Sequence, residues 1–349
     1  MRKRFSFTAT AGLAALALAA GFAAPAKDAQ AETWKFALEE VDGSVQDAFA
    51  EKFAELVKEK SGGDITVSIF PYGQLGTSGD LTELVQTNAV QITNASPGHL
   101  GSVVEEMQVF SIPYLLSQND EATKKVLDSA DVIYDDLGDS LRKKGLEILT
   151  MYPEGEMVWT ANKKITKPAD FDGFKMRTMT SPLLTEAYKS FGATPTPMAY
   201  GEVYSALQLG TIDGQVNPIF AIQEMKFYEV QSHMIWAGQQ EFTTSVVTGN
   251  DWYNGLSEEK RQILDESIEE ATDYIFPKQR EYNKERLEKI KEAKPELEMI
   301  RLSEEQRDVF RERAEQVRDK YVEMTGEDGK RILEKLTKAF EDAEAEVTN

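Results

Sequence analysis

The chain has no cysteine and only two histidines among its 349 residues. A disulfide, a thiolate metal site and a cysteine nucleophile are therefore excluded. His99 and His233 do not share a metal-binding spacing, so we expect no metal site. The sequence also lacks a phosphate-binding loop, a dinucleotide fingerprint and a Gly-x-Ser-x-Gly nucleophile elbow. We therefore expect no cofactor.

Positive charge is scarce. Lysine and arginine number 39 against 60 aspartates and glutamates, which gives a formal net charge of −21. This balance argues against nucleic acids and anionic membrane surfaces as partners. We interpret most of the charge as serving solubility. If such an acidic protein holds an acidic ligand, it needs a local basic anchor to do so.

Long apolar runs are also scarce, and the one that stands out lies at the N-terminus. It extends from Ala11 to Ala24, after the basic start Met1-Arg-Lys-Arg4 and before Ala29-Gln-Ala31. This order of segments predicts a secretory signal peptide over residues 1–31. The run is short for a membrane span and rich in alanine. We expect a mature, soluble, exported protein that begins near Glu32 and does not insert into a membrane.

The first third of the mature chain alternates between strand and helix patterns. Strands are expected at 34–38, 64–70 and 90–94, and helices at 45–60 and 81–87. This order is typical of a parallel sheet with helices on its faces. Ligands of such sheets bind at the carboxyl ends of the strands. Glu40 and His99 follow two of these expected ends.

A second block has the same α/β character. Strands are expected at 146–151, 157–160 and 175–179, a loop at 153–156 and a helix at 181–191. The last hundred residues read as mostly helical, with an interruption or bend at Pro277. We expect one lobe from residues 32–152 plus about 243–282. A second lobe comprises 153–242 plus about 283–349, including the C-terminal helices.

Arg177 lies in the middle of a short apolar strand, beside Met176 and Met179. A guanidinium in such surroundings needs an anion, because an unpaired buried charge is costly. The anion is either a carboxylate of the protein or the planar acid group of a ligand. Asn217 before Pro218 either donates to a ligand oxygen or caps a turn.

Aromatic side chains near predicted strand ends and loops either fill the core or line a small pocket beside these polar groups. They are Trp159, Tyr200, Phe220 and Phe242.

No catalytic set assembles from the sequence. Glu154 and Glu156 form a possible acid–base pair, and His99 a possible base. We interpret the two carboxylates as solvated loop residues and His99 as a hydrogen-bonding group. A periplasmic hydrolase stays as a remote alternative, and we expect that the protein is not an enzyme.

Several motifs resemble the DctP-type solute-binding proteins of TRAP transporters over essentially the whole mature chain. The motifs are Gln74-Leu-Gly76, Ile112-Pro-Tyr-Leu115, Asp170-Phe-Asp-Gly-Phe-Lys-Met-Arg177, Gly192-Ala-Thr-Pro-Thr-Pro197 and Ile212-Asp-Gly-Gln-Val-Asn-Pro218. The resemblance implies two lobes, each a mixed sheet flanked by helices, joined by crossing strands and a long helix. It also implies a periplasmic monomer that closes on a small organic acid. The small and large membrane subunits of a permease would then receive the ligand.

The resemblance also assigns residues. Arg177 matches the arginine that binds the ligand's acid group, and Asn217 matches its polar helper. The segments 152–157, 177–180 and 217–220 are similar to ectoine receptors, in which Glu40 and Phe242 match pocket positions.

Those receptors enclose a delocalised cation in aromatic rings, but here His99 and Tyr200 replace two larger apolar rings. The segments 95–100, 158–163, 225–231 and 239–242 look more like isethionate receptors. We therefore favour a two-carbon sulfonate such as isethionate, with ectoine or hydroxyectoine as the alternative.

Overall fold

The computed structural model describes residues 31–348. The predicted signal peptide lies outside the described residues except for Ala31. Within 31–348, no helix combines the length and the apolar character that crossing a bilayer requires.

The first sheet has five strands in the order β2-β1-β3-β10-β4. Its strands are β1 (Glu32–Ala37), β2 (Ile65–Phe70), β3 (Ile92–Ala95), β4 (Leu146–Glu156) and β10 (Glu241–Gly249). Strand β1 pairs in parallel with β2 and β3, while β10 runs antiparallel to β3 and β4. The sheet is therefore mixed.

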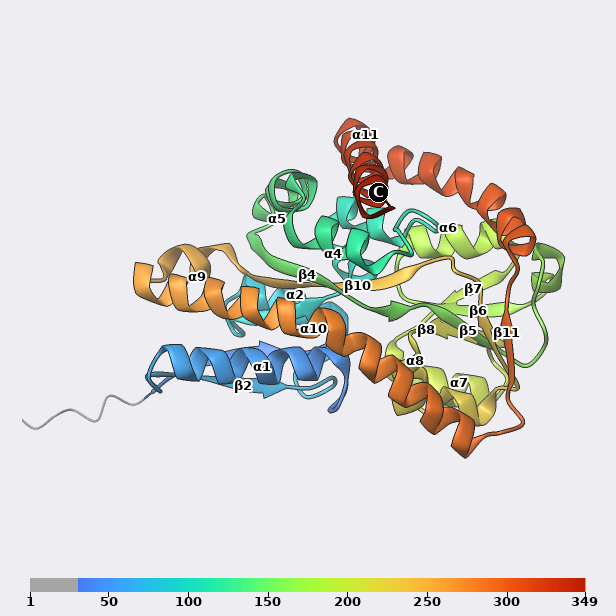
Figure 1. Ribbon diagram of the computed structural model, residues 1–349, viewed down its shortest axis with the longest axis horizontal. Coiled ribbons are helices and arrows are strands. Elements are labelled where there is room, and N and C mark those ends of the chain that lie inside the picture. Colours follow the sequence, from blue (N-terminus) through green and yellow to red (C-terminus); the bar gives the residue numbers. More distant parts are fainter. Residues whose placement is uncertain (1–30, 349) are drawn as a thin grey trace, which may run out of the picture. The chain divides into compact units, whose positions relative to one another are not determined.

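The second sheet has six strands in the order β11-β9-β5-β8-β6-β7 and is also mixed. Its strands are β5 (Val158–Ala161), β6 (Lys175–Thr178), β7 (Thr194–Pro197), β8 (Gly214–Asn217), β9 (His233–Trp236) and β11 (Glu298–Arg301). Two mixed sheets flanked by helices confirm the predicted two-lobe α/β fold (Figure 1).

Helices lie between the strands and along the sheets. They are α1 (Val45–Lys60), α2 (Ser78–Gln86), α3 (Pro97–Leu100), α4 (Asp120–Ser129), α5 (Gly138–Arg142), α6 (Pro182–Phe191), α7 (Val203–Gln208), α8 (Ile219–Glu224), α9 (Asn250–Gly255), α10 (Glu258–Ala293) and α11 (Glu304–Thr348). Helix α1 begins where the Ser44 side chain accepts from the Asp47 backbone. Its predicted apolar face is buried, and Gly62 and Gly63 end it with positive φ angles.

The chain passes between the two sheets three times, twice from strand to strand and once through helix α10, which leads to β11. Strand β4 reaches Glu156, and β5 begins two residues later at Val158. The return path leads through residues 237–240 into β10. Our prediction of a loop at 153–156 was wrong, because β4 continues through it and pairs with β10 along its length. Pro153 and Gly155 suggested a loop, but a shift in register accommodates them within the strand.

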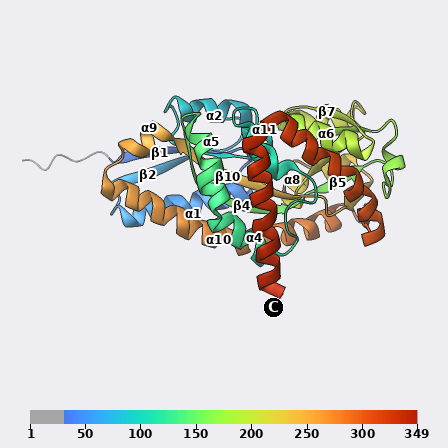
Figure 2. The ribbon, with the colours of Figure 1, turned by 90° about the horizontal axis from the view of Figure 1, so that it is seen from above.

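Helix α10 is the long helix that spans both lobes. It packs against α1 and β4 of the first lobe and against α8 of the second (Figure 1). The helix continues through Pro277, so this proline does not end it. Helix α11 contains a non-helical residue, Gly326, with φ 67°, where its two segments change direction (Figure 2). These features confirm the expected crossing strands and long helix.

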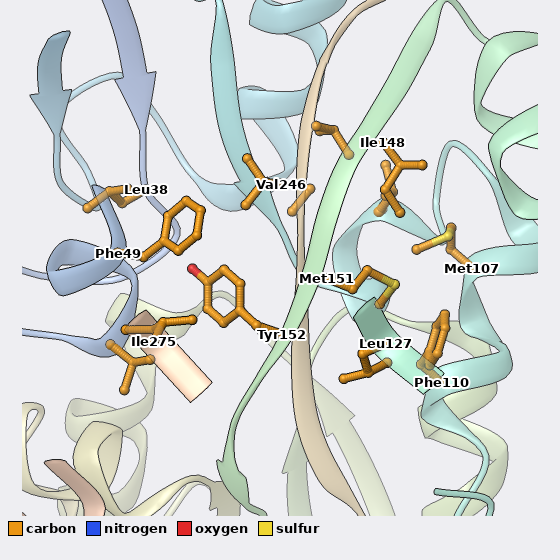
Figure 3. Close-up of a cluster of buried hydrophobic side chains, with 14 of the residues drawn as sticks. Leu38, Phe49, Met107, Phe110, Leu127, Ile148, Met151, Tyr152, Val246 and Ile275 are labelled. Carbon is orange, nitrogen blue, oxygen red and sulfur yellow. The ribbon is translucent and has the colours of Figure 1, made fainter. Parts of the chain in front are cut away.

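Buried side chains cover both faces of β4 and β10 (Figure 3). On one side Tyr152 stacks on Phe49, with ring centroids 4.8 Å apart, and Ile275 of α10 lies nearby. On the other side lie Met151 and Phe110. The crossing strands are thus held in a packed core where they leave the first sheet.

Candidate ligand-binding site

Arg177 occupies β6 and is only 1% exposed. Its Nε and Nη2 atoms donate to the carbonyl of Met198 at 3.3 and 3.0 Å. In the described part of the chain these hydrogen bonds go to a carbonyl rather than to a carboxylate. Burial lowers the pKa of Arg177 to about 10, so the side chain stays protonated at neutral pH. A charged guanidinium that donates to a carbonyl rather than to a carboxylate is suited to bind an anionic group of a ligand.

Glu40 and Tyr200 lie close to this guanidinium. Tyr200, Tyr72 and Glu40 all act on Arg177 to raise its pKa against the effect of burial. Burial raises the pKa of Glu40 well above its usual value, and the charge of Glu154 adds to the shift. The Tyr200 hydroxyl opposes that shift, but the pair does not reach hydrogen-bond geometry.

Within residues 31–348, the Tyr200 hydroxyl and Glu40 Oε2 are buried without a hydrogen-bond partner. Such atoms cost free energy unless something pairs with them. They are therefore candidate contacts for a bound solute.

The ring of Tyr72 contacts that of Tyr200 edge to face, with centroids 5.6 Å apart. The Tyr72 hydroxyl accepts from the Gly201 backbone at 3.2 Å, and Phe227 meets Tyr200 from another side at 6.0 Å. Tyr72 follows β2, whereas Tyr200 belongs to the second lobe. Tyr72 and Phe227 were not among the residues predicted from the sequence, and their contacts with Tyr200 make them candidates for the site. Tyr72 was detectable, because it lies in the loop directly after a predicted strand.

Asn217 ends β8, and Phe220 lies three residues later in α8. Both are buried. The Asn217 side-chain amide donates to Gln215, which in turn donates to Thr160 at 3.0 Å. The structure thus places the two predicted residues on one strand-to-helix turn, at the carboxyl end of a strand of the second sheet.

His99 in α3 connects to the first lobe's acidic residues. Its Nδ1 atom lies 3.0 Å from Ser96 Oγ and 3.2 Å from Glu39 Oε1. Glu39 is buried, and its Oε2 atom accepts from the Ser96 backbone at 2.8 Å. Phe242 is 6% exposed at the start of β10 and packs with the core of the second lobe.

Trp159 is placed differently from the other predicted site residues. It is fully buried in β5, and its indole N–H donates to the Tyr188 hydroxyl at 2.9 Å. Its ring lies 5.1 Å from Phe171 and 5.3 Å from Phe310. This hydrogen bond and these contacts link Trp159 to the aromatic core of the second lobe rather than to the Arg177 group.

Our interpretation of Glu154 as a solvated loop residue was wrong. Glu154 is 0% exposed, and its Oε1 atom accepts from Gln46 Nε2 at 2.9 Å. Burial raises the pKa of Glu154 to about 8. Glu156 is partly buried, and burial raises its pKa as well. No group of three or more acidic or histidine side chains in residues 31–348 is arranged to hold a metal ion.

Within residues 31–348, two mixed sheets joined by crossing strands hold a buried guanidinium close to a carboxyl that has no hydrogen-bond partner. This arrangement is suited to binding a small polar solute. The family model described as "Bacterial extracellular solute-binding protein, family 7" (DctP) matches residues 36–324. The chain belongs to this family, whose members are solute-binding receptors.

Two relatives are similar over most of their length. The chain is 42% identical over 301 residues to the ectoine-binding periplasmic protein TeaA of Halomonas elongata, covering 86% of each protein. It is 42% identical over 299 residues to the ectoine/5-hydroxyectoine-binding protein UehA of Ruegeria pomeroyi, with the same coverage.

A solved structure of the periplasmic ectoine-binding protein from the TeaABC TRAP transporter of Halomonas elongata has a similar fold. It superposes with a TM-score of 0.86 at 43% identity, over 89% of this chain and 100% of that chain.

Proposed function

We propose that the protein is the periplasmic receptor of a TRAP transporter for ectoine or 5-hydroxyectoine. The observation that carries this proposal is the 42% identity, over 86% of each chain, to two proteins named for binding these solutes. These names support the ectoine alternative better than our first preference, isethionate, because neither relative is named for a sulfonate.

The chemistry of the site supports the same choice. Ectoine is a zwitterion with a carboxylate and a delocalised cation. Arg177 offers a buried positive charge and Glu40 a buried acceptor without a partner. Isethionate carries a single negative charge and brings no cation to Glu40. The cationic ring of ectoine, in contrast, would favour the ionised form of this buried carboxyl, whose pKa is raised.

In this proposal Arg177 and Asn217 hold the carboxylate of the ligand, and Glu40 pairs with its cationic ring. Tyr200, Phe220 and Phe242 form the walls, while His99 orients Glu39 beside Glu40. Rings close to a delocalised cation add cation–π attraction. Trp159 supports this arrangement from the core.

Transport follows from closure of the two lobes. A ligand that contacts both lobes favours the closed state by its extra affinity for that state. We propose that the closed monomer delivers the solute to the small and large membrane subunits of the permease. In this proposal the protein binds and releases the solute without changing it chemically.

A thermal-shift screen followed by calorimetry tests this assignment with ectoine, 5-hydroxyectoine, isethionate and succinate. A ligand at 100 times its Kd stabilises the folded state by about 2.7 kcal/mol. We expect a clear rise in melting temperature with ectoine or hydroxyectoine and none with isethionate. A response to isethionate alone contradicts the proposal. Recovery of unchanged ectoine after long incubation, measured by NMR, separates a receptor from the hydrolase alternative.

A further inference from the structure

A continuous chain of hydrogen bonds connects the two segments that carry the candidate ligand contacts. It begins at Gln46 of α1, which is 0% exposed. Gln46 Oε1 accepts from the Glu39 backbone N–H at 2.9 Å, and its Nε2 donates to Glu154 Oε1 at 2.9 Å. Since Glu39 directly precedes Glu40, Gln46 fixes the backbone beside a candidate ligand contact of the first lobe.

The chain ends at Asn283 of α10. Asn283 Nδ2 donates to the Glu154 carbonyl at 2.7 Å, and its Oδ1 accepts from the Phe220 backbone N–H at 3.1 Å. Phe220 lies on the turn that also carries Asn217. Asn283 therefore fixes the ligand-binding turn of the second lobe to β4.

Glu154 joins these two halves because of an irregularity in β4. Pro153 pairs with Thr243 and Gly155 with Phe242, so Glu154 is an extra residue without a partner on β10. Such a bulge re-aims the backbone and the side chain of the inserted residue. Gly155 has a φ of 131°, and a Cβ there would lie 2.5 Å from Asn283 Nδ2. Glycine at this position is what lets Asn283 reach the Glu154 carbonyl.

Helices α1 and α10 approach β4 from the same side, as the positions of Phe49, Tyr152 and Ile275 show (Figure 3). Two residues beyond Tyr152, Glu154 therefore meets Gln46 with its carboxyl and Asn283 with its carbonyl. The four bonds run from Glu39 through Gln46, Glu154 and Asn283 to Phe220.

We propose that Gln46 and Asn283 are positioning residues that set ligand affinity without touching the ligand. They hold the end of β1 and the β8–α8 turn at the separation that the bound solute requires. The amide group of Gln46 is buried and that of Asn283 is partly buried. Each has specific partners, so removing either side chain leaves those partners unpaired. The identity of the solute rests on the function proposed above, whereas the linkage between the two segments does not.

The absence of cysteine allows the linkage to be tested without any ligand. Spin labels are attached after Glu59→Cys and Leu209→Cys, two exposed positions on different lobes. The distance between the two labels is then measured by pulsed electron–electron double resonance. It is compared among the otherwise unaltered protein, Gln46→Ala and Asn283→Ala. We expect both variants to broaden the distance distribution towards longer separations.

With ectoine, stopped-flow measurements should show a dissociation rate raised by roughly tenfold in either variant, because each variant loses two hydrogen bonds of the chain. The association rate should change by less than about twofold, because the ligand contacts themselves are intact. The double variant should dissociate little faster than the faster single variant, since both changes break the same chain.

Gln91→Ala is the matched control. Its side-chain Oε1 accepts from the Lys35 backbone at 2.9 Å within β1, outside the chain of hydrogen bonds from Glu39 to Phe220. Its loss should leave distances and rates unchanged. Asn283→Asp replaces the alanine variant if that variant does not fold. Aspartate still offers an oxygen to the Phe220 N–H, but it has no N–H for the Glu154 carbonyl and places a second oxygen against it. We expect this variant, too, to lengthen the distances.

Unchanged distances in the folded variants, or fully additive rate effects in the double variant, overturn the proposal. If the unaltered protein does not bind ectoine, the proposed function fails, but the distance measurement still decides the linkage.

Discussion

Two buried regions of this protein are built in opposite ways. Around Trp159, aromatic rings meet edge to face, and the indole N–H is paired with Tyr188. Around Arg177, the buried atoms Glu40 Oε2 and the Tyr200 hydroxyl have no partner within the described chain. The first region gains stability from packing, while the second retains unpaired polar groups that we propose pair with the ligand.

From this difference we infer that the buried residues around Trp159 serve stability, and we propose that those around Arg177 serve binding. Trp159 and Tyr200 look alike in the sequence, because both are aromatic residues near predicted strand ends or loops. The structure separates them by their surroundings. Substitutions in the two regions should therefore have different consequences, in stability for one region and in affinity for the other.

The largest effect is expected for Trp159→Ala. Removing a large buried ring costs about 3–5 kcal/mol, and urea unfolding should show this loss. Trp159→Phe, which keeps a ring but loses the bond to Tyr188, should cost about 1 kcal/mol. Ectoine affinity of the folded variants should stay near that of the unaltered protein. Normal stability together with lost affinity would return Trp159 to the binding site.

Arg177→Ala should have the reverse signature. We expect ectoine affinity to fall about a hundredfold or more, because a charge-assisted pair in a closed site is lost. The unliganded protein should keep its stability, since a buried charge held by one carbonyl is removed. Calorimetry and urea unfolding measure the two quantities.

Arg177→Lys is the control for charge without geometry. It keeps a cation but not the planar pair of donors, so we expect an intermediate affinity. Unaltered binding in Arg177→Ala would remove this residue from the proposed site.

Local patterns in the sequence predicted much of the fold. The alternation in β1 and β2 and the apolar face of α1 depend on neighbours along the chain, and the structure confirms them. The same holds for α6, which begins at Pro182 behind the cap Ser181. Strand boundaries moved by a few residues, as in β3, which covers Ile92–Ala95 rather than 90–94.

The features that the sequence did not predict depend on distant partners. Pro153 and Gly155 signal a loop locally, but β10 pairs with this segment from almost ninety positions away in the chain. Burial of Glu154 requires Gln46, which is 108 residues distant. No periodicity records such a pairing. The candidate residues Arg177 and Asn217 stand out locally because a charged or amide group interrupts an apolar strand end.

Glu154→Gln should have the smallest effect. It tests the carboxyl whose charge acts on Glu40 in the region around Arg177. The pKa of Glu154 rises from 4.5 to about 8 on folding, mainly by burial. Between these values the folded protein keeps a proton that the unfolded chain loses, so its stability falls as pH rises through this window. The slope from one such group is at most about 1.4 kcal/mol per pH unit. Glutamine keeps an oxygen that accepts from Gln46, and it does not titrate. The slope of the unfolding free energy against pH should therefore lose the contribution of one proton.

Urea unfolding between pH 5 and pH 9 measures this slope. Glu59→Gln, on the exposed face of α1, is the matched control and should keep the pH dependence of the unaltered protein. Glu40 lies in the same region with its own raised pKa, so part of the slope should persist in Glu154→Gln. If the variant and the unaltered protein have the same pH dependence, Glu154 is ionised in the folded state. The contrast with the aromatic region would then rest on Arg177, Glu40 and Tyr200 alone.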